Sequence, residues 1–154
     1  MINIIGTYNC KADAKGRVSI PSGLKDQLIP LLDDGFVLKY GRFSKCLELY
    51  PKARYNEMML GLREKDQFNP ENVNALRKFV EGAQIVKIDG SSRLQIPKDL
   101  AIYAGIGKEV VLTATIDIIE VWDRSRYDEV NNIKPEEYSK MLKSAFGKND
   151  KPIS

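Results

Sequence analysis

The chain contains two copies of one sequence pattern, and this internal repeat restricts its possible folds more than any other feature. The segment KADAKGRVSIPSGL (11–24) matches KIDGSSRLQIPKDL (87–100), with equivalent residues 76 positions apart. Further on, LELYPKARYNEM matches IEVWDRSRYDEV at a spacing of 72. The first copy therefore contains four extra residues, which we expect in the hairpin around Gly35 or Gly41.

Both copies predict the same order of secondary structure. A short strand leads through a turn that begins with aspartate into a second strand, and a proline then begins a short helix, where its missing N–H costs nothing. Two β-rich runs, FVLKY with CLELY and VVLTAT with IIEVW, predict a hairpin, and a last helix closes each copy. The prolines are Pro21 and Pro97, and the short strands are 7–11 and 17–20 in the first copy and 84–88 and 93–96 in the second.

Two further helices are predicted outside the repeated motifs. Asn69 is a good N-cap, Pro70 is a good first helical residue, and Gly82 is a stop for a helix that links the two copies. A final helix opens at Pro135 and ends at Gly147. Its apolar side chains form one stripe, which we expect to be a packing face. The stripe consists of Tyr138, Met141, Leu142, Ala145 and Phe146.

The predicted fold class is α+β. Each copy offers only four short strands and one helical turn, which cannot bury much apolar surface alone. Two copies in one chain can interleave their hairpins and close a small β-barrel with pseudo-twofold symmetry and flanking helices. We therefore divide the chain into a first repeat (1–62), a linking helix (63–82), a second repeat (83–130) and a C-terminal helix and tail (131–154).

The composition excludes most enzyme chemistry. The chain has no histidine, which removes Ser-His and Cys-His catalysis and every histidine-containing zinc site. The two cysteines, Cys10 and Cys46, lie in apolar, strand-like segments, and we expect them to be free buried thiols. We therefore expect no catalytic residues, cofactor, metal or small-molecule substrate. We also expect no membrane association and a cytoplasmic location, because the chain has no apolar run of ~20 residues and no secretory signal.

The first repeated motif predicts a basic hairpin tip. The segment DAKG (13–16) fits a type I turn, in which Gly16 can take the positive φ that returns the chain into a strand. This turn would project Lys15 and Arg17, with Lys25 nearby on the following helix. A two-stranded ribbon fits the major groove of DNA, and arginine can hold guanine bidentately. The tip therefore indicates binding to double-stranded DNA.

The second motif predicts a weaker tip. The segment DGSS (89–92) moves glycine to the second turn position and lacks the lysine, and Ala101 stands where the first copy has Lys25. Arg93 remains a candidate DNA contact. The other repeated residues are expected to be structural: Asp13 and Asp89 as turn-formers or salt-bridge partners of the following arginine, Gly16, Pro21 and Pro97 in the turn and helix start, and Tyr50 and Trp122 in the core.

These motifs resemble the MraZ family of bacterial regulators, which are encoded with cell-division and cell-wall genes. The resemblance rests on DAKGRVSIP, its echo DGSSRLQIP, and the following CLELYP and IIEVWD, and it covers nearly the whole chain. By motif match, Lys15 and Arg17 correspond to the family's DNA-contacting pair. The chain departs from the family at Ser91 and Ser92, where a glycine commonly precedes the arginine, and at Lys25, where arginine is common.

The resemblance implies a fold and a function together. The fold would be two tandem SpoVT-AbrB-like swapped-hairpin repeats in a pseudo-twofold barrel. The function would be repression of the protein's own operon by a homo-oligomeric ring that binds short repeated promoter boxes, and the protein would be associated with the nucleoid.

Two alternatives remain open at this point. One is an antitoxin-like swapped-hairpin protein that binds a partner protein through an unfolded tail as well as its own promoter, although only seven residues, 148–154, follow Gly147. The other is a structural ring protein with no specific DNA target. Salt-sensitive DNA binding is expected of the repressor and of the antitoxin-like protein, but not of the structural ring protein.

Overall fold

The computed structural model describes residues 3–147, which belong to two compact units, Met1–Arg124 and Ser125–Ser154. The strands are β1 (Thr7–Lys11), β2 (Arg17–Ser19), β3 (Phe36–Tyr40), β4 (Leu47–Pro51), β5 (Gln84–Val86), β6 (Arg93–Gln95), β7 (Glu109–Thr115) and β8 (Ile118–Asp123). The helices are α1 (Ser22–Leu28), the 3-10 turn η1 (Ile29–Leu31), α2 (Lys52–Arg63), α3 (Pro70–Val80), α4 (Lys98–Ala104), α5 (Arg124–Val130) and α6 (Pro135–Phe146).

The order of elements predicted from the repeat is confirmed, and so are its main end signals. The Asn69 side chain accepts a hydrogen bond from the Glu71 amide at 2.9 Å and so caps α3. Gly105 ends α4 with a left-handed φ of 64°. Pro21 and Pro97 occupy the N-cap positions of α1 and α4, so each helix begins one residue later than predicted.

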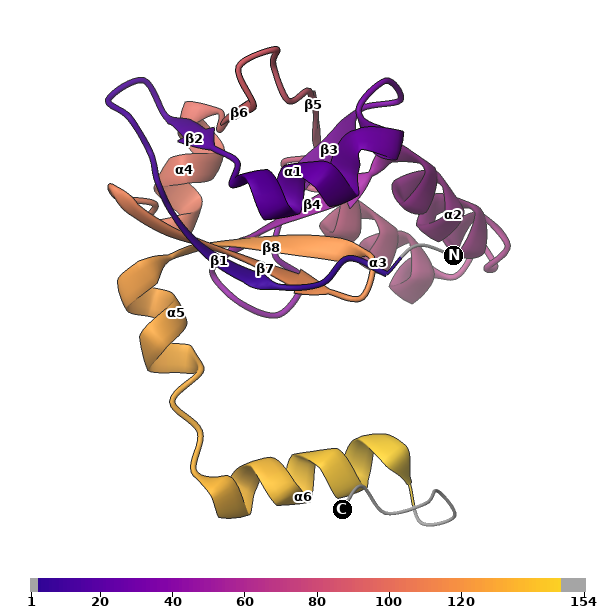
Figure 1. Cartoon of the computed structure of the whole chain (residues 1–154). Coiled ribbons are helices and arrows are strands. Elements are labelled where there is room, and N and C mark those ends of the chain that lie inside the picture. The colour runs from indigo at the N-terminus through magenta and orange to yellow at the C-terminus, as the bar shows by residue number, and fades with distance from the viewer. Residues whose placement is uncertain (1–2, 148–154) are drawn as a thin grey trace. The chain divides into compact units, whose positions relative to one another are not determined.

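The hairpins of the two copies interleave, as predicted from their small size. The larger sheet has the order β1-β7-β8-β4-β3-β5, so that β1 of the first copy pairs with β7 of the second, and β5 pairs with β3. The two copies meet at its centre, where Glu48 on β4 lies opposite Glu120 on β8. Strands β2 and β6 form a separate two-stranded ribbon in which Val18 lies opposite Leu94 (Figure 1).

The prediction of a closed barrel is wrong for the strands that the structure describes. The larger sheet stays open, with β1 and β5 as its edges, and the β2–β6 ribbon is a second sheet. Only single bridges, Ala12 to Val18 and Ile88 to Leu94, continue the pairing between the sheet and the ribbon. Beyond these bridges the ribbon strands do not pair with the strands of the larger sheet, so the described strands do not close a barrel.

The four extra residues of the first copy are shared between two places. Val37 pairs with Tyr50, and Val111 pairs with Trp122, so 12 residues separate the first pair and 10 the second. Two extra residues therefore lie in the β3–β4 turn around Gly41, and the other two lie before β3, near Gly35. The prediction of a single insertion in the hairpin was correct only in part.

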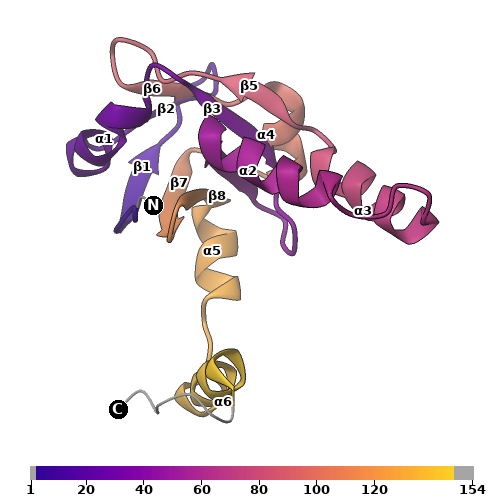
Figure 2. The same ribbon diagram turned by 90° about the vertical axis from the view of Figure 1, so that its right-hand side faces the viewer.

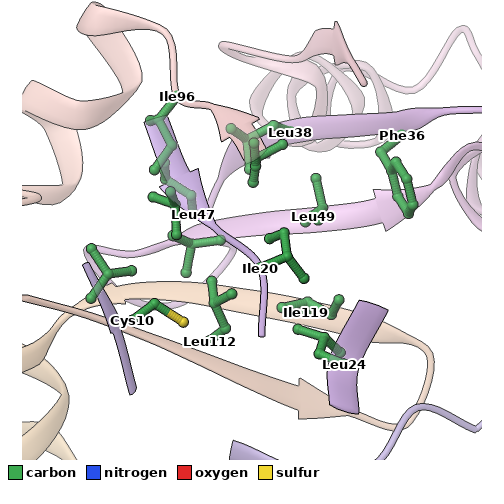
Figure 3. Close-up of a cluster of buried hydrophobic side chains, with 14 of the residues drawn as sticks. Cys10, Ile20, Leu24, Phe36, Leu38, Leu47, Leu49, Ile96, Leu112 and Ile119 are labelled. Carbon is green, nitrogen blue, oxygen red and sulfur yellow. The ribbon is translucent and has the colours of Figure 1, made fainter. Parts of the chain in front are cut away.

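The main hydrophobic core lies between the larger sheet and the elements that follow each hairpin tip. Equivalent residues of the two copies contribute alike, since Val18, Leu94, Leu24 and Leu100 are all at most 1% exposed. Figure 3 shows Leu24 of α1 and Ile20 and Ile96 after the ribbon strands among Leu38, Leu49, Leu112 and Ile119 of the sheet. Because Val18 and Leu94 point into this core, their neighbours in β2 and β6 face outward.

A second, smaller cluster lies under α2 and α3. Tyr55 of α2 and Phe79 of α3 pack on Tyr50, which is fully buried, as predicted for a core aromatic. Figure 2 shows α2 and α3 at the same end of the first unit, away from α1 and β1. Trp122, the equivalent of Tyr50, is 4% exposed and also confirms its predicted burial.

The second unit consists of α6 and all but the first residue of α5. Three large side chains of the apolar stripe predicted on α6, those of Tyr138, Met141 and Phe146, are exposed. No helix in residues 3–147 is long and apolar enough to span a bilayer. The tail at 148–154, invoked for an antitoxin-like protein, lies outside the described residues.

Candidate nucleic-acid interface

The first hairpin tip is a turn that Asp13 organises through its side chain. Its Oδ1 atom accepts hydrogen bonds from the amides of Lys15 and Arg17, both at 2.9 Å. Its Oδ2 atom accepts from the Arg17 Nε atom at 2.7 Å. The Gly16 amide closes the turn on the Asp13 carbonyl at 3.0 Å, and Gly16 has the predicted positive φ, 78°. Asp13 is thus both turn-former and partner of the arginine.

The second tip has the same geometry despite its different sequence. Asp89 accepts from the amides of Ser91 and Arg93 at 2.8 and 3.0 Å, and from the Arg93 Nε atom at 3.1 Å. Ser92 occupies the position of the glycine with a φ of 61°, a conformation that costs a residue with a Cβ about 1–2 kcal/mol. The degenerate sequence therefore strains the second tip without changing its shape.

The hydrogen bonds to the two aspartates also affect their charge state. The Arg17 amide, which donates to the carboxylate, lowers the pKa of Asp13, and the Arg93 amide lowers the pKa of Asp89 in the same way. A lowered pKa means that the turn gains stability from the ionised form, and this gain is lost as the pH falls through the folded-state value. Both tips are therefore organised at neutral pH.

The two predicted arginines share one surface, the outer face of the β2–β6 ribbon. Arg17 lies opposite Gln95, and Arg93 lies opposite Ser19. The arginines are thus diagonal neighbours across the ribbon, an arrangement that sets their Cα atoms about 7–8 Å apart. The sequence motifs predicted two separate tips, whereas the structure brings their arginines together on one ribbon.

Each arginine is held by one edge of its guanidinium group. The aspartate engages the Nε atom, so among the described residues the two terminal nitrogens are left to meet another partner. The side chains of Arg17 and Arg93 are 31% and 34% exposed, so both are partly covered and oriented. An oriented guanidinium can donate two parallel hydrogen bonds to a guanine or a phosphate.

Backbone hydrogen bonds join each tip to the opposite copy. The Ile96 amide donates to the Gly16 carbonyl at 2.9 Å, and the Ile20 amide donates to the Ser92 carbonyl at 2.8 Å. The segment before α4 therefore contacts the first tip, and the segment before α1 contacts the second. The sequence suggested that Lys25 on α1 lies near the first tip, but the segment that leads into α1 contacts the second tip. The contact of Lys25 with DNA stays a prediction.

Gln95 supports the first tip and was missed by sequence analysis. Its Nε2 atom donates to the Lys15 carbonyl at 2.7 Å. The equivalent residue in the first copy is Ser19, whose side chain is too short for such a contact. The strand pattern gave no signal for this role, because it depends on pairing between the two copies.

A hollow of about 770 Å³ lies beside the first tip. Its lining includes Lys15 from the tip, Lys98 from the first residue of α4 and Lys108 from the segment after α4. Lys98 and Lys108 were not predicted as site residues. Within the described residues, no group of three or more acidic, histidine or cysteine side chains is placed to hold a metal ion.

The sequence matches a family model of the MraZ protein, which its description calls antitoxin-like, over residues 4–78 and again over 79–147. The chain belongs to the MraZ family. A relative in Christiangramia forsetii, named transcriptional regulator MraZ, is 43% identical over 97% of both chains. Proteins of the same name in Flavobacterium psychrophilum and Phocaeicola vulgatus are 40% and 32% identical, over 96% and 97% of this chain and 94% and 97% of their own. These family relatives are named as regulators and not as enzymes.

Proposed function

We propose that the chain is a sequence-specific DNA-binding transcriptional regulator that reads base edges with the outer face of the β2–β6 ribbon. The observation that carries this proposal is the pair Arg17 and Arg93, each fixed through Nε by an aspartate and diagonal across one ribbon. A two-stranded ribbon fits the major groove, where an arginine that presents two donors selects guanine. The names of the family relatives support the same class of function.

The regulated DNA, in this proposal, is the promoter of the protein's own operon in a cell-division and cell-wall gene cluster, and the effect is repression in the nucleoid. One chain with a net charge of +3 can neutralise only a few phosphates, so a single copy would bind weakly. A homo-oligomeric ring that displays several ribbons could bind repeated boxes together and gain avidity without new contacts. The exposed apolar stripe of α6 supports assembly, because such a surface is usually covered.

The experiment is a mobility-shift titration with the DNA upstream of this gene and a scrambled DNA of equal length and composition. In this titration we expect tighter binding to the upstream DNA. Footprinting should show protection of repeated boxes about one helical turn apart, and light scattering should give a mass of several subunits. Equal affinity for both DNAs at every salt concentration would contradict the proposal.

A second candidate function is an antitoxin-like protein that binds a partner protein. The exposed side chains Tyr138, Met141 and Phe146 of α6 favour it, since they could equally bind a different protein. Light scattering separates the cases: a chain that is monomeric alone would favour a foreign partner, and a closed oligomer favours contacts between copies.

A further inference from the structure

The hollow beside the first hairpin tip is built by both copies of the repeat. The first copy supplies the tip itself, 12–16, and the second supplies Gln95, Ile96 and residues in and after α4. Small residues line it, namely Ala14, Gly16, Ala101 and Gly107. The absence of large side chains at these positions leaves a concave space of about 770 Å³ instead of a packed contact.

The charge of this hollow is strongly positive. Lys15, Lys98 and Lys108 are all exposed and line the hollow. The one acidic residue among the lining residues is Asp13, and its carboxylate is already engaged by Arg17 at 2.7 Å. Three cations around a concavity attract an anion more strongly than three cations on a flat surface.

The equivalent position at the second tip does not carry this charge. Ser91 and Ser22 stand where the hollow has Lys15 and Lys98, at the spacing of 76. Lys108 lies three residues before Val111, and Asp34 lies three before Val37, which is equivalent to Val111 by strand pairing. The hollow is therefore a property of the first tip, and the repeat alone does not require it.

We propose that Lys15, Lys98 and Lys108 hold a phosphate of the DNA backbone in this hollow, an inference that rests on the proposed DNA-binding function. The hollow adjoins the ribbon, because Gln95 both lines the hollow and lies opposite Arg17. A phosphate held there flanks the base edges that Arg17 meets. The three lysines fix the register of the ribbon on the duplex, and the arginines supply the sequence discrimination.

The first test is the salt dependence of DNA affinity in the full-length protein. The double variant Lys98→Ala/Lys108→Ala should bind the upstream and scrambled DNAs more weakly by similar factors. Its plot of log affinity against log salt should be shallower by about 1 per subunit engaged, as expected for the loss of one phosphate contact. The matched control, Lys52→Ala/Lys65→Ala, removes two lysines at or just beyond the ends of α2 and should keep the wild-type slope. Equal salt slopes for the two double variants would overturn the inference. A wild-type protein that binds neither DNA would instead overturn the proposed function.

The second test locates the phosphate. Ethylation of the phosphate that occupies the hollow should block binding of the wild-type protein and should no longer matter for the Lys98→Ala/Lys108→Ala variant. An identical interference pattern for both proteins would contradict the inference. Titration with inorganic pyrophosphate distinguishes a small-anion site: submillimolar binding that the variant loses, with an unchanged salt slope on DNA, would also overturn it.

Discussion

Gly16 and Ser92 occupy the same position in the two hairpin tips, and both have a positive φ, 78° and 61°. Only the glycine adopts this conformation without cost. We therefore expect Ser92→Gly to raise the free energy of unfolding by about 0.5–1 kcal/mol, measured by chemical denaturation. The reverse change, Gly16→Ser, should lower it, because a Cβ at Gly16 would lie 3.2 Å from the Ile96 carbonyl oxygen.

Ser91→Gly is the control for this pair, since Ser91 does not have a positive φ. A stabilisation by Ser91→Gly as large as that by Ser92→Gly would mean that strain at Ser92 is not the cause.

The repeat explains why so much of the fold could be predicted. Register between the copies predicted the turns, the short helices and the interleaved hairpins, because equivalent residues such as Leu24 and Leu100 have equivalent environments. It could not predict that β2 and β6 form a ladder with each other and only single bridges to the rest of the chain, since a strand of three residues carries no signal for its partner. The open sheet is the consequence.

The candidate site was predicted by residue type and not by arrangement. Lys15, Arg17 and Arg93 followed from the motifs, but the ribbon that the two arginines share depends on pairing between strands 76 residues apart. The sequence carried no signal for Gln95, Lys98 and Lys108 for the same reason, because each lies next to the tip of the other copy. The sequence order places Lys25 after the first tip. The swap, which the sequence does not reveal, instead brings the segment before α1 to the second tip.

Gln95→Ala should weaken DNA binding without unfolding the protein. The change removes the hydrogen bond to the Lys15 carbonyl, worth about 1 kcal/mol, so affinity should fall by roughly fivefold. Gln67→Ala, which truncates an exposed glutamine beyond the end of α2, should leave affinity unchanged. Fluorescence anisotropy with the upstream DNA measures both, and equal effects of the two changes would show that Gln95 does not position the tip.

Glu48 is the centre of a buried ionic network and should be important for stability. It is 2% exposed and contacts the Lys39 Nζ atom at 3.4 Å, the Arg42 Nε atom at 3.1 Å and the Tyr50 hydroxyl, which donates at 2.8 Å. Burial lowers the pKa of Lys39, and Glu48 opposes that change. Glu48→Gln leaves a buried cation without its partner, so we expect a loss of about 3–5 kcal/mol in the free energy of unfolding.

Denaturant titration measures this loss. Glu64→Gln, at the exposed end of α2, is the control and should change stability by less than about 0.5 kcal/mol. A loss for Glu48→Gln no larger than this control would mean that the network is not coupled to folding.

The two cysteines should be unreactive in the native protein. Burial raises the pKa of the Cys10 thiol to about 11 and that of Cys46 to about 12, so little thiolate forms at pH 8. We expect almost no labelling by iodoacetamide in buffer and two labels per chain in denaturant, counted by mass spectrometry. Fast labelling of the folded protein would contradict the buried, thiol state.

The most direct test of the account is the ratio of affinities for upstream and scrambled DNA in Arg17→Ala, Arg93→Ala and the double variant. Each lost bidentate contact costs ~1–3 kcal/mol of discrimination. Each single variant should lower the ratio, and the double variant should bind both DNAs equally while its circular dichroism stays that of the wild type. A double variant that still prefers the upstream DNA, with an intact fold, would contradict the claim that the two arginines of the β2–β6 ribbon read its sequence.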